Sequence, residues 1–280
     1  MASELAGKVA VITGAARGLG AAMAELFVAE GGKVIIADLR DEEGEALASR
    51  LGAGACYRRC DVSSREEMTA LVDYAVATFG GLDAMINNAG LTDASFGSLL
   101  DADFEMFEAI MAVNVKGVML GTQLAARHMA QHGGGAVVNI SSISGVRPGF
   151  GFFSYRASKA AVINFSQSAA SELGGHLIRV NCLCPGNIPT EMGSYAHTPE
   201  MSEQKARHIG ETIRDVRMGW QPLKRQGSPR DIAEAALFLC SDRSAQISGQ
   251  VLSVDGGSAA TDSRSQIAEI IAARARAEAE

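Results

Sequence analysis

The 280-residue sequence contains no long uninterrupted hydrophobic run. No stretch reaches the roughly 18 consecutive apolar residues typical of a membrane-spanning helix. The first residues, MASELAGKVAVITG, lack the charged start and long apolar run of a secretion signal. The sequence also has no basic block, and its net charge is −7. These absences argue against a membrane span, a secretion signal and nucleic acid as a partner.

Cysteine is scarce and odd in number, which predicts reduced thiols and a cytoplasmic location. Two of the five cysteines, Cys182 and Cys184, are separated by one residue in a strand-like run. No second pair or nearby histidine completes a metal site around them, so we interpret them as buried structural thiols and expect no metal.

Short β-rich runs alternate with helical patterns along most of the chain. This alternation predicts βαβ units, a parallel sheet and a single α/β domain. We expect strands within residues 8–13, 33–38, 54–62, 82–90, 133–141, 177–186 and 249–257. We expect helices within residues 19–32, 41–52, 65–81, 101–114, 115–131, 154–175 and 229–242.

Two segments depart from this rhythm. Residues 187–228 carry prolines, methionines and the only tryptophan, Trp220, and we expect a substrate lid there. The tail at 259–280 has Ile267, Ile270 and Ile271 at helical spacing, which predicts an appended helix that docks on a neighbouring subunit. A frayed tail rich in Ala, Glu and Arg is the open alternative. The catalytic domain is therefore expected to span residues 1–258.

A glycine-rich turn, VITGAARGLGAAM, joins the first strand to the first helix. Glycines in such a turn let the backbone approach a pyrophosphate, and the helix that follows points free N–H groups at it. Asp38 ends the next strand, where a carboxylate accepts from the ribose hydroxyls of NAD and repels the 2′-phosphate of NADP. Arg17, in the turn, is a basic residue that would favour the 2′-phosphate of NADP. Leu39, directly after Asp38, has no polar group to bind that phosphate. The alternative is a structural turn with Asp38 capping a helix.

The segment SYRASKAAV places Tyr155 and Lys159 one helical turn apart. An ammonium beside a phenol favours the phenolate, so Lys159 is expected to lower the pKa of Tyr155 toward neutrality and make it an acid or base. The alternative is that Tyr155 packs in the protein and Lys159 is solvated.

Several further motifs occur in order: TGAARGLG, DV, NNAG, AVNVKG, SSISG, YRASK, PGNIPT and SVDGG. With them the chain resembles the short-chain dehydrogenases/reductases over about residues 5–258. The resemblance implies a Rossmann-type, doubly wound parallel sheet of seven strands in three α/β/α layers. It also implies a homotetramer formed through the helices at 115–131 and 154–173 and through the last strand. A Tyr-x-x-x-Lys spacing is typical of carbonyl chemistry in this family, whereas enoyl reductases place the lysine further along.

The resemblance also implies site residues. The catalytic ones are Asn114, Ser142, Tyr155 and Lys159, with Asn114 holding a water beside Lys159. The cofactor-binding ones are Gly14, Arg17, Gly18, Leu19, Gly20, Asp38, Leu39, Asp61, Val62, Asn88, Ala89, Gly90, Tyr155, Lys159, Pro185, Gly186, Ile188 and Thr190. Candidate substrate residues are Thr92, Ser144, Phe150, Phe152, Asn187 and Met192.

We therefore expect an enzyme that interconverts a secondary alcohol and a ketone, with NAD as cofactor and Tyr155 as acid or base. Together with Leu91 and the loop out to Trp220, the candidate pocket residues are mostly apolar and include no arginine cluster for a phosphate. This composition favours a neutral alicyclic, aromatic or steroid-like substrate. The alternatives are a reductase of a 3-oxoacyl thioester or a sugar-type carbonyl, and a non-catalytic NAD-binding regulator.

Overall fold

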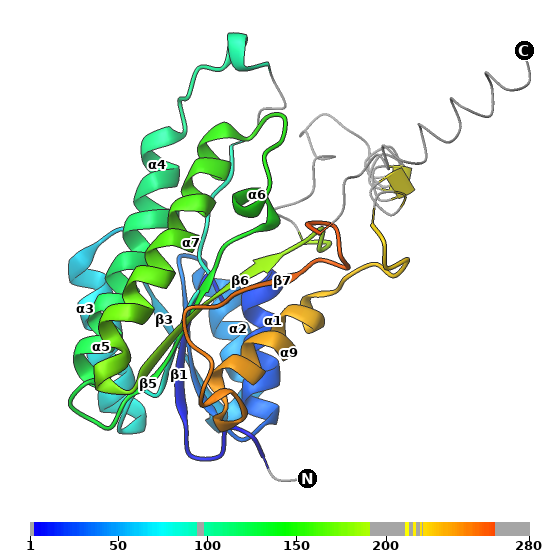
Figure 1. The fold of residues 1–280 in the computed structure, drawn as a ribbon. Helices are drawn as coiled ribbons and strands as arrows, with labels where there is room; N and C mark the ends of the chain where they lie inside the picture. Colours follow the sequence, from blue (N-terminus) through cyan, green and yellow to red (C-terminus); the bar gives the residue numbers. More distant parts are fainter. Residues whose placement is uncertain are drawn as a thin grey trace, which may run out of the picture.

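The computed structural model describes residues 3–93, 98–190, 211–212, 215–216, 219 and 221–260. Its centre is a seven-stranded sheet in the order β3-β2-β1-β4-β5-β6-β7, and every neighbouring pair is parallel (Figure 1). The strands are β1 Val9–Thr13, β2 Lys33–Asp38, β3 Ala55–Arg59, β4 Ala84–Asn87, β5 Gly135–Ile140, β6 Ile178–Pro185 and β7 Val251–Val254.

The central strands are buried on both faces, which explains their continuous apolar sequences. All five residues of β1 are buried. Side chains alternate between faces, so Ala10 and Ile12 belong to one core cluster and Val11 to the other.

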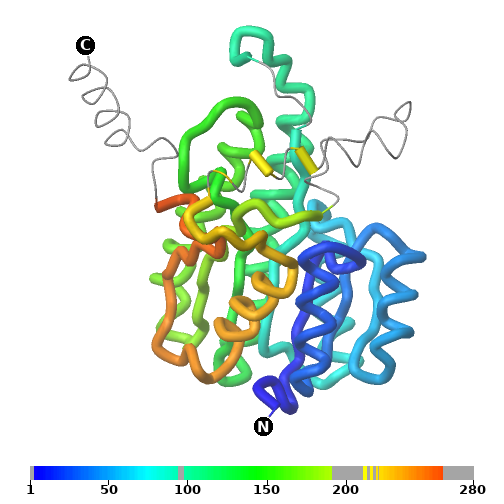
Figure 2. Tube along the Cα trace, turned by 90° about the vertical axis from the view of Figure 1, so that its right-hand side faces the viewer, coloured from blue at the N-terminus to red at the C-terminus, as the bar shows by residue number. Residues whose placement is uncertain are grey.

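Helices cover both faces of this sheet. One layer holds α1 Gly18–Ala29, α2 Asp41–Leu51 and α9 Pro229–Cys240, and Figure 2 shows α1 and α9 side by side. The opposite layer holds α3 Arg65–Phe79, α5 Val118–Met129 and α7 Phe153–Leu173. The predicted three-layer, doubly wound fold is therefore confirmed.

The chain reverses its direction across the sheet between β1 and β4. Strands β2 and β3 build outward on one side of β1, and β4 then returns to pair with its other side. Such a switch point opens a crevice at the carboxyl ends of the two strands. The glycine turn after β1 and the NNAG segment of β4 both arrive at this crevice.

The structure corrects one helical prediction. In place of two helices at 101–114 and 115–131, α4 Phe107–Met111 continues through a π-helical segment, Ala112–Gly117, into α5. Among the described residues, only this run, Phe107–Met129, is long and apolar enough to cross a membrane, but its most apolar window is 61% buried inside the protein. Since it packs against α3 and β4, it is a core helix of this fold.

Two predicted segments lie mainly outside the described residues. Residues 191–210 and most of 213–220 of the expected lid fall there, as do residues 261–280 of the tail. The lid and the tail helix therefore stay predictions.

Candidate active site

The glycine turn fits closely against the loop after β4. Gly14 has a positive φ of 61°, and a Cβ on it would lie 2.7 Å from the Cα of Ala89. A Cβ on Gly20 would lie 2.4 Å from the carbonyl oxygen of Gly14. Larger residues at either position would push the turn away from the sheet, so the glycines set how deep the crevice is.

Asn88 holds the two sides of the crevice together. Its Nδ2 donates to the carbonyl oxygens of Thr13 and Gly14, each at 2.9 Å. The Thr13 hydroxyl oxygen in turn accepts from the backbone N–H groups of Asn88 at 3.0 Å and Ala89 at 3.1 Å. These bonds fix the carboxyl ends of β1 and β4 relative to each other.

The Asp38 carboxylate is anchored by backbone donors. Its Oδ2 accepts from the N–H of Ala16 at 3.0 Å, and its Oδ1 accepts from Leu39 at 2.8 Å and Arg40 at 3.2 Å. A carboxylate has about four acceptor sites, so Oδ2 keeps capacity for a further donor. Leu39 is exposed beside it.

A second basic residue joins Arg17 near this carboxylate. Partial burial is the main cause that lowers the pKa of Arg17; the positive charge of Arg40 adds to this, and Asp38 opposes it. The sequence pattern points only to Arg17, and the structure adds Arg40 to the charges around Asp38.

Asp61 and Val62 follow β3 at the same edge of the sheet. Asp61 Oδ1 accepts from both the backbone N–H and the hydroxyl of Ser63 at 2.8 Å. Val62 packs on the π-helical segment, where a Cβ on Gly117 would lie 2.9 Å from its Cγ2. Leu19, on the first turn of α1, packs against the core.

Lys159 lies beneath the ring of Tyr155. The Lys159 side chain is buried; its Nζ donates to the carbonyl oxygen of Ile140 at 2.9 Å and lies 5.6 Å from the centroid of the Tyr155 ring. Burial lowers the pKa of Lys159 to about 8, and Cys182 and Cys184 act in the opposite direction. Lys159 is therefore not the solvated surface lysine of the alternative interpretation.

Asn114 lies in the π-helical segment and is fully buried. Its Oδ1 accepts from the N–H of Leu91 at 2.7 Å, and its Nδ2 donates to the Leu91 carbonyl and to the Ser158 hydroxyl, both at 2.9 Å. A Cβ on Gly90 would lie 3.3 Å from Asn114 Oδ1 and 3.5 Å from Lys159 Nζ, so both side chains face this glycine. The side chain thus ties the loop after β4 to α7, and its water-holding role stays a prediction.

Two adjacent serines after β5 have different surroundings. Ser141 is buried and its hydroxyl donates to the carbonyl oxygen of Lys159 at 2.7 Å. The Ser142 hydroxyl oxygen accepts from the N–H of Ser144 at 3.1 Å and caps the short helix α6, Ile143–Val146. The sequence patterns did not predict α6.

The segment after β6 closes the crevice from the other side. Pro185 ends β6, and a Cβ on Gly186 would lie 2.7 Å from the Cα of Asp255. Ile188 packs against the core, and the Thr190 side chain approaches Gly18, where a Cβ would lie 3.7 Å from its Cγ2. The structure therefore brings the segment after β6 to the glycine turn.

The described candidate substrate residues lie in the segments that follow β4, β5 and β6. Phe150 is 68% exposed, Phe152 is half-buried with a positive φ of 52°, and Asn187 is half-buried. The Thr92 hydroxyl donates to the Asp93 carbonyl oxygen at 3.2 Å. Met192 lies outside the described residues.

Asp93 makes a contact that no sequence pattern predicts. Its Oδ2 accepts from the backbone N–H of Ser154 at 3.1 Å, so it caps the first turn of α7 from a different loop. The residue at the cap position of the helix itself, Phe152, makes no side-chain cap bond. No local sequence signal connects positions 61 residues apart.

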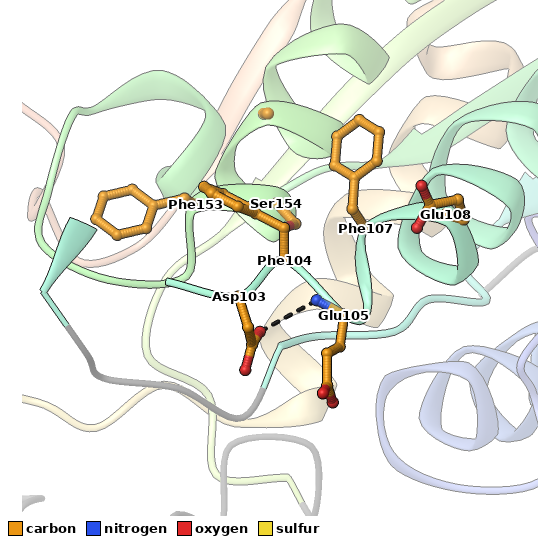
Figure 3. Close-up of a pocket in the computed structure, with 8 residues that line it drawn as sticks. Asp103, Phe104, Glu105, Phe107, Glu108, Phe153 and Ser154 are labelled. Carbon is orange, nitrogen blue, oxygen red and sulfur yellow. Dashed lines mark hydrogen bonds between the residues drawn. The ribbon is translucent and has the colours of Figure 1, made fainter. Parts of the chain in front are cut away.

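A separate pocket of about 560 Å³ lies where the segment before α4 meets α7 (Figure 3). Phe104, Phe107 and Phe153 line it together with Ser154 and acidic residues. Along an α-helix of about 3.6 residues per turn, Phe153 and Ala157 lie nearly opposite Tyr155 and Lys159. The pocket is therefore distinct from the Tyr155–Lys159 crevice.

Within the ranges that the structure describes, no three His, Cys, Asp or Glu side chains come together in a way that could hold a metal ion. Cys182 and Cys184 are buried beside Val118 and Val162 as free thiols. This arrangement confirms their interpretation as buried thiols.

Comparison with known proteins identifies the family. Residues 14–259 match a family model described as Enoyl-(Acyl carrier protein) reductase. The chain is 42% identical over 259 residues to Momilactone A synthase of Oryza sativa subsp. japonica, with 91% of each chain covered. It is 39% identical over 257 residues to Zerumbone synthase of Zingiber zerumbet, covering 91% of this chain and 95% of the relative. It is 38% identical over 256 residues to Tropinone reductase-like 2 of Erythroxylum coca, with 91% of each chain covered. The chain belongs to the short-chain dehydrogenase/reductase family of oxidoreductases, whose members use NAD or NADP.

Proposed function

We propose that this oxidoreductase interconverts a secondary alcohol and a ketone with NAD as cofactor. The observation that carries the proposal is the buried ammonium of Lys159, held 5.6 Å from the centre of the Tyr155 ring at the switch-point crevice. A buried lysine beneath a phenol suits proton transfer to and from a substrate oxygen.

Tyr155 is the proton carrier in this proposal. As phenolate it takes the hydroxyl proton when an alcohol is oxidised, and as phenol it returns a proton when a ketone is reduced. The Lys159 ammonium favours the phenolate by its charge. Ser142 donates a hydrogen bond to the same substrate oxygen and stabilises its developing negative charge.

A nicotinamide dinucleotide suits the residues of the crevice. At Gly18 an added Cβ would meet only the Thr190 side chain, at 3.7 Å, so the turn stays open there, and Asp38 Oδ2 keeps an acceptor site. Asp38, the glycine turn and Asn88–Gly90 would hold the adenosine and phosphates, and Pro185–Thr190 with Lys159 the nicotinamide end. The cofactor supplies or accepts the hydride when bound.

NAD is favoured over NADP because the Asp38 carboxylate repels a 2′-phosphate. Arg17 and Arg40 weaken this repulsion without removing the carboxylate, which is already fixed by three backbone N–H groups. The expected preference is therefore for NAD.

The proposed substrate is a neutral alicyclic, aromatic or steroid-like alcohol. Phe150 and Phe152, on the loop between Ser142 and Tyr155, offer apolar surface to such a ring. One relative is named Tropinone reductase-like 2, and others are named Momilactone A synthase and Zerumbone synthase. A 3-oxoacyl thioester or a sugar-type carbonyl is the alternative substrate, and an NAD-binding regulator the alternative without catalysis.

The name of the matching family model refers to enoyl reduction instead. The Tyr-x-x-x-Lys spacing supports carbonyl chemistry, because enoyl reductases of this family place the lysine further along. Assays of an enoyl thioester and of cyclic ketones with NADH separate the two reactions.

The decisive experiment is oxidation of a panel of ring alcohols with NAD, followed as NADH absorbance. We expect turnover of at least one secondary alcohol and none of the corresponding tertiary alcohol, which has no hydride to give. NADH binding without turnover of any alcohol or ketone would instead support the regulator.

We further propose a cytoplasmic homotetramer. The five cysteines are free thiols, which suits a reducing compartment. Apolar side chains are exposed before α4, on α4 and on α5, at Phe104, Phe107 and Met119, and a second copy of the chain would cover them. Light scattering on the full chain tests the assembly, and a monomeric mass would contradict it.

A further inference from the structure

The loop between α6 and α7 wraps around one side chain, that of Arg156. The guanidinium donates through Nε to the carbonyl oxygen of Gly151 at 3.0 Å and through Nη1 to that of Arg147 at 3.1 Å. These two carbonyls lie at opposite ends of the loop. One planar group therefore fixes both ends, which a flexible ammonium could not do in the same way.

The middle of the loop passes directly over the same guanidinium. A Cβ on Gly149 would lie 2.3 Å from Arg156 Nη2 and 2.6 Å from its Cζ. Even one added methyl group would have to displace either the arginine or the loop. Gly149 and Arg156 are therefore matched in shape as well as hydrogen-bonded through neighbouring residues.

The loop is also attached at points away from Arg156. The Arg147 side chain donates through Nη1 to the carbonyl oxygen of Ser258, beyond β7. Gly145 of α6 fits against the backbone of Lys159, where a Cβ would lie 2.6 Å from the carbonyl carbon. The connection from Ser142 to Tyr155 is thus held on both sides, and Arg156 is its internal support.

A bulky residue at the end of the loop takes a strained conformation. Phe152 has a positive φ of 52°, a region that L-residues with large side chains rarely adopt. The backbone N–H of residue 156 donates to the Phe152 carbonyl oxygen at 2.8 Å, so the first turn of α7 also holds this conformation. Strain of this kind persists where the surrounding structure holds it in place.

We propose that Arg156 is a positioning residue for substrate selection: it latches the loop at 147–152 into the shape that presents Phe150 and Phe152 to the organic part of the substrate. The inference rests on the proposed alcohol–ketone function and adds a determinant of substrate size. Arg156 acts through the loop, and neither the cofactor nor the reacting oxygen needs to touch it.

The test compares Arg156→Ala, Arg156→Lys and wild type in the full chain. With NADH, the KM for a two-ring ketone such as 2-decalone is expected to rise about tenfold in Arg156→Ala, because loop order is lost before binding. The KM for small 2-butanone and the Kd for NADH are expected to change less than about twofold. Arg156→Lys should be intermediate, since it keeps the charge but not the paired donors.

A second readout does not depend on turnover. Hydrogen exchange in the peptide containing residues 147–152 should be faster in Arg156→Ala than in wild type, without faster exchange in β1 or β5. Arg50→Ala is the matched control. Arg50 lies on α2, far in the sequence from residues 147–152, and forms an exposed ion pair with Glu25. If no ketone is turned over by wild type, the proposed function fails, and this exchange measurement still decides whether the latch exists.

A double-mutant cycle tests the shape match. Gly149→Ala should raise the KM for 2-decalone in the wild-type background and have little effect in the Arg156→Ala background, because the clashing group is then gone. Additive effects of the two substitutions would overturn the latch. So would unchanged loop exchange in Arg156→Ala, or equal loss of affinity for both ketones and NADH.

Discussion

The Lys159 Nζ lies 5.6 Å from the centroid of the Tyr155 ring and 2.9 Å from the carbonyl oxygen of Ile140. One buried ammonium is thus held between the end of β5 and a phenol ring on its own helix. Because only a single helical turn separates the two residues, the proton carrier and its charged neighbour are expected to be coupled, and each is substituted in turn below.

Tyr155→Phe removes the proton-carrying hydroxyl and leaves the ring. We expect kcat to fall by about 10²–10⁴-fold, the usual contribution of a positioned acid or base. The affinity for NADH, measured by fluorescence, should be nearly unchanged. Tyr74→Phe is the control, since that ring lies on α3 under Arg58. Retention of more than about a tenth of the wild-type kcat would require another proton carrier.

Lys159→Met should change the pH dependence of stability. The pKa of Lys159 is lowered by burial from 10.5 to about 8, so the folded state binds this proton less well than the unfolded state. Stability of the wild type therefore rises with pH between about 8 and 10.5 and loses this contribution as pH falls. Below that window the buried charge costs roughly 3 kcal/mol, which the methionine variant avoids.

Urea unfolding of both proteins across this pH range checks the Lys159 prediction. The stability advantage of Lys159→Met over wild type should be largest near neutral pH and should shrink as pH rises. Lys116→Met, at an exposed lysine, serves as the control and should show no such trend. An advantage independent of pH would contradict the prediction.

Asp38→Asn tests the cofactor preference. Wild type should show the higher kcat/KM with NAD, and the variant should narrow the NAD-to-NADP ratio by about tenfold, since one charge repulsion is removed. Asp41→Asn is a suitable control, because Asp41 pairs with Tyr57 and Arg59 instead of the glycine turn. Equal kcat/KM for the two cofactors in wild type would refute the assignment.

The two neighbouring serines should respond differently to alanine. Ser142→Ala should lower kcat by about 10–10³-fold if its hydroxyl stabilises charge on the substrate oxygen. Ser141→Ala should instead reduce the free energy of unfolding by about 1 kcal/mol, because its hydroxyl bonds the Lys159 carbonyl. Kinetics and urea unfolding of both variants provide the comparison. A larger kcat loss in Ser141→Ala would reverse their roles.

Much of the fold could be predicted because its signals are local. The continuous apolar run of β1 reflects burial on both faces, and the glycines after it mark a turn that Cβ atoms would block. The same reasoning places Asp38 at the end of β2. These features depend on neighbours in sequence, which a pattern can detect.

The missed features depend on contacts between distant positions. Asp93 caps α7 across 61 residues, and Arg40 joins Arg17 only when the loop after β2 folds back. The π-helical segment also escaped prediction, since α- and π-helical turns use similar apolar spacing. Arg156 lies between Tyr155 and Lys159 in the motif, and no sequence pattern shows its hydrogen bonds to the carbonyl oxygens of Gly151 and Arg147.

The π-helical segment at Ala112–Gly117 sets the rotational phase between α4 and α5. Such a wider turn is commonly an insertion of about one residue into an α-helix. If the segment became α-helical with all its residues retained, the extra residue would turn α4 by about 100° relative to α5. The face of α4 that holds the buried Ile110 would then turn partly away from the protein. The wider turn around Asn114 therefore determines which face of α4 packs against the protein.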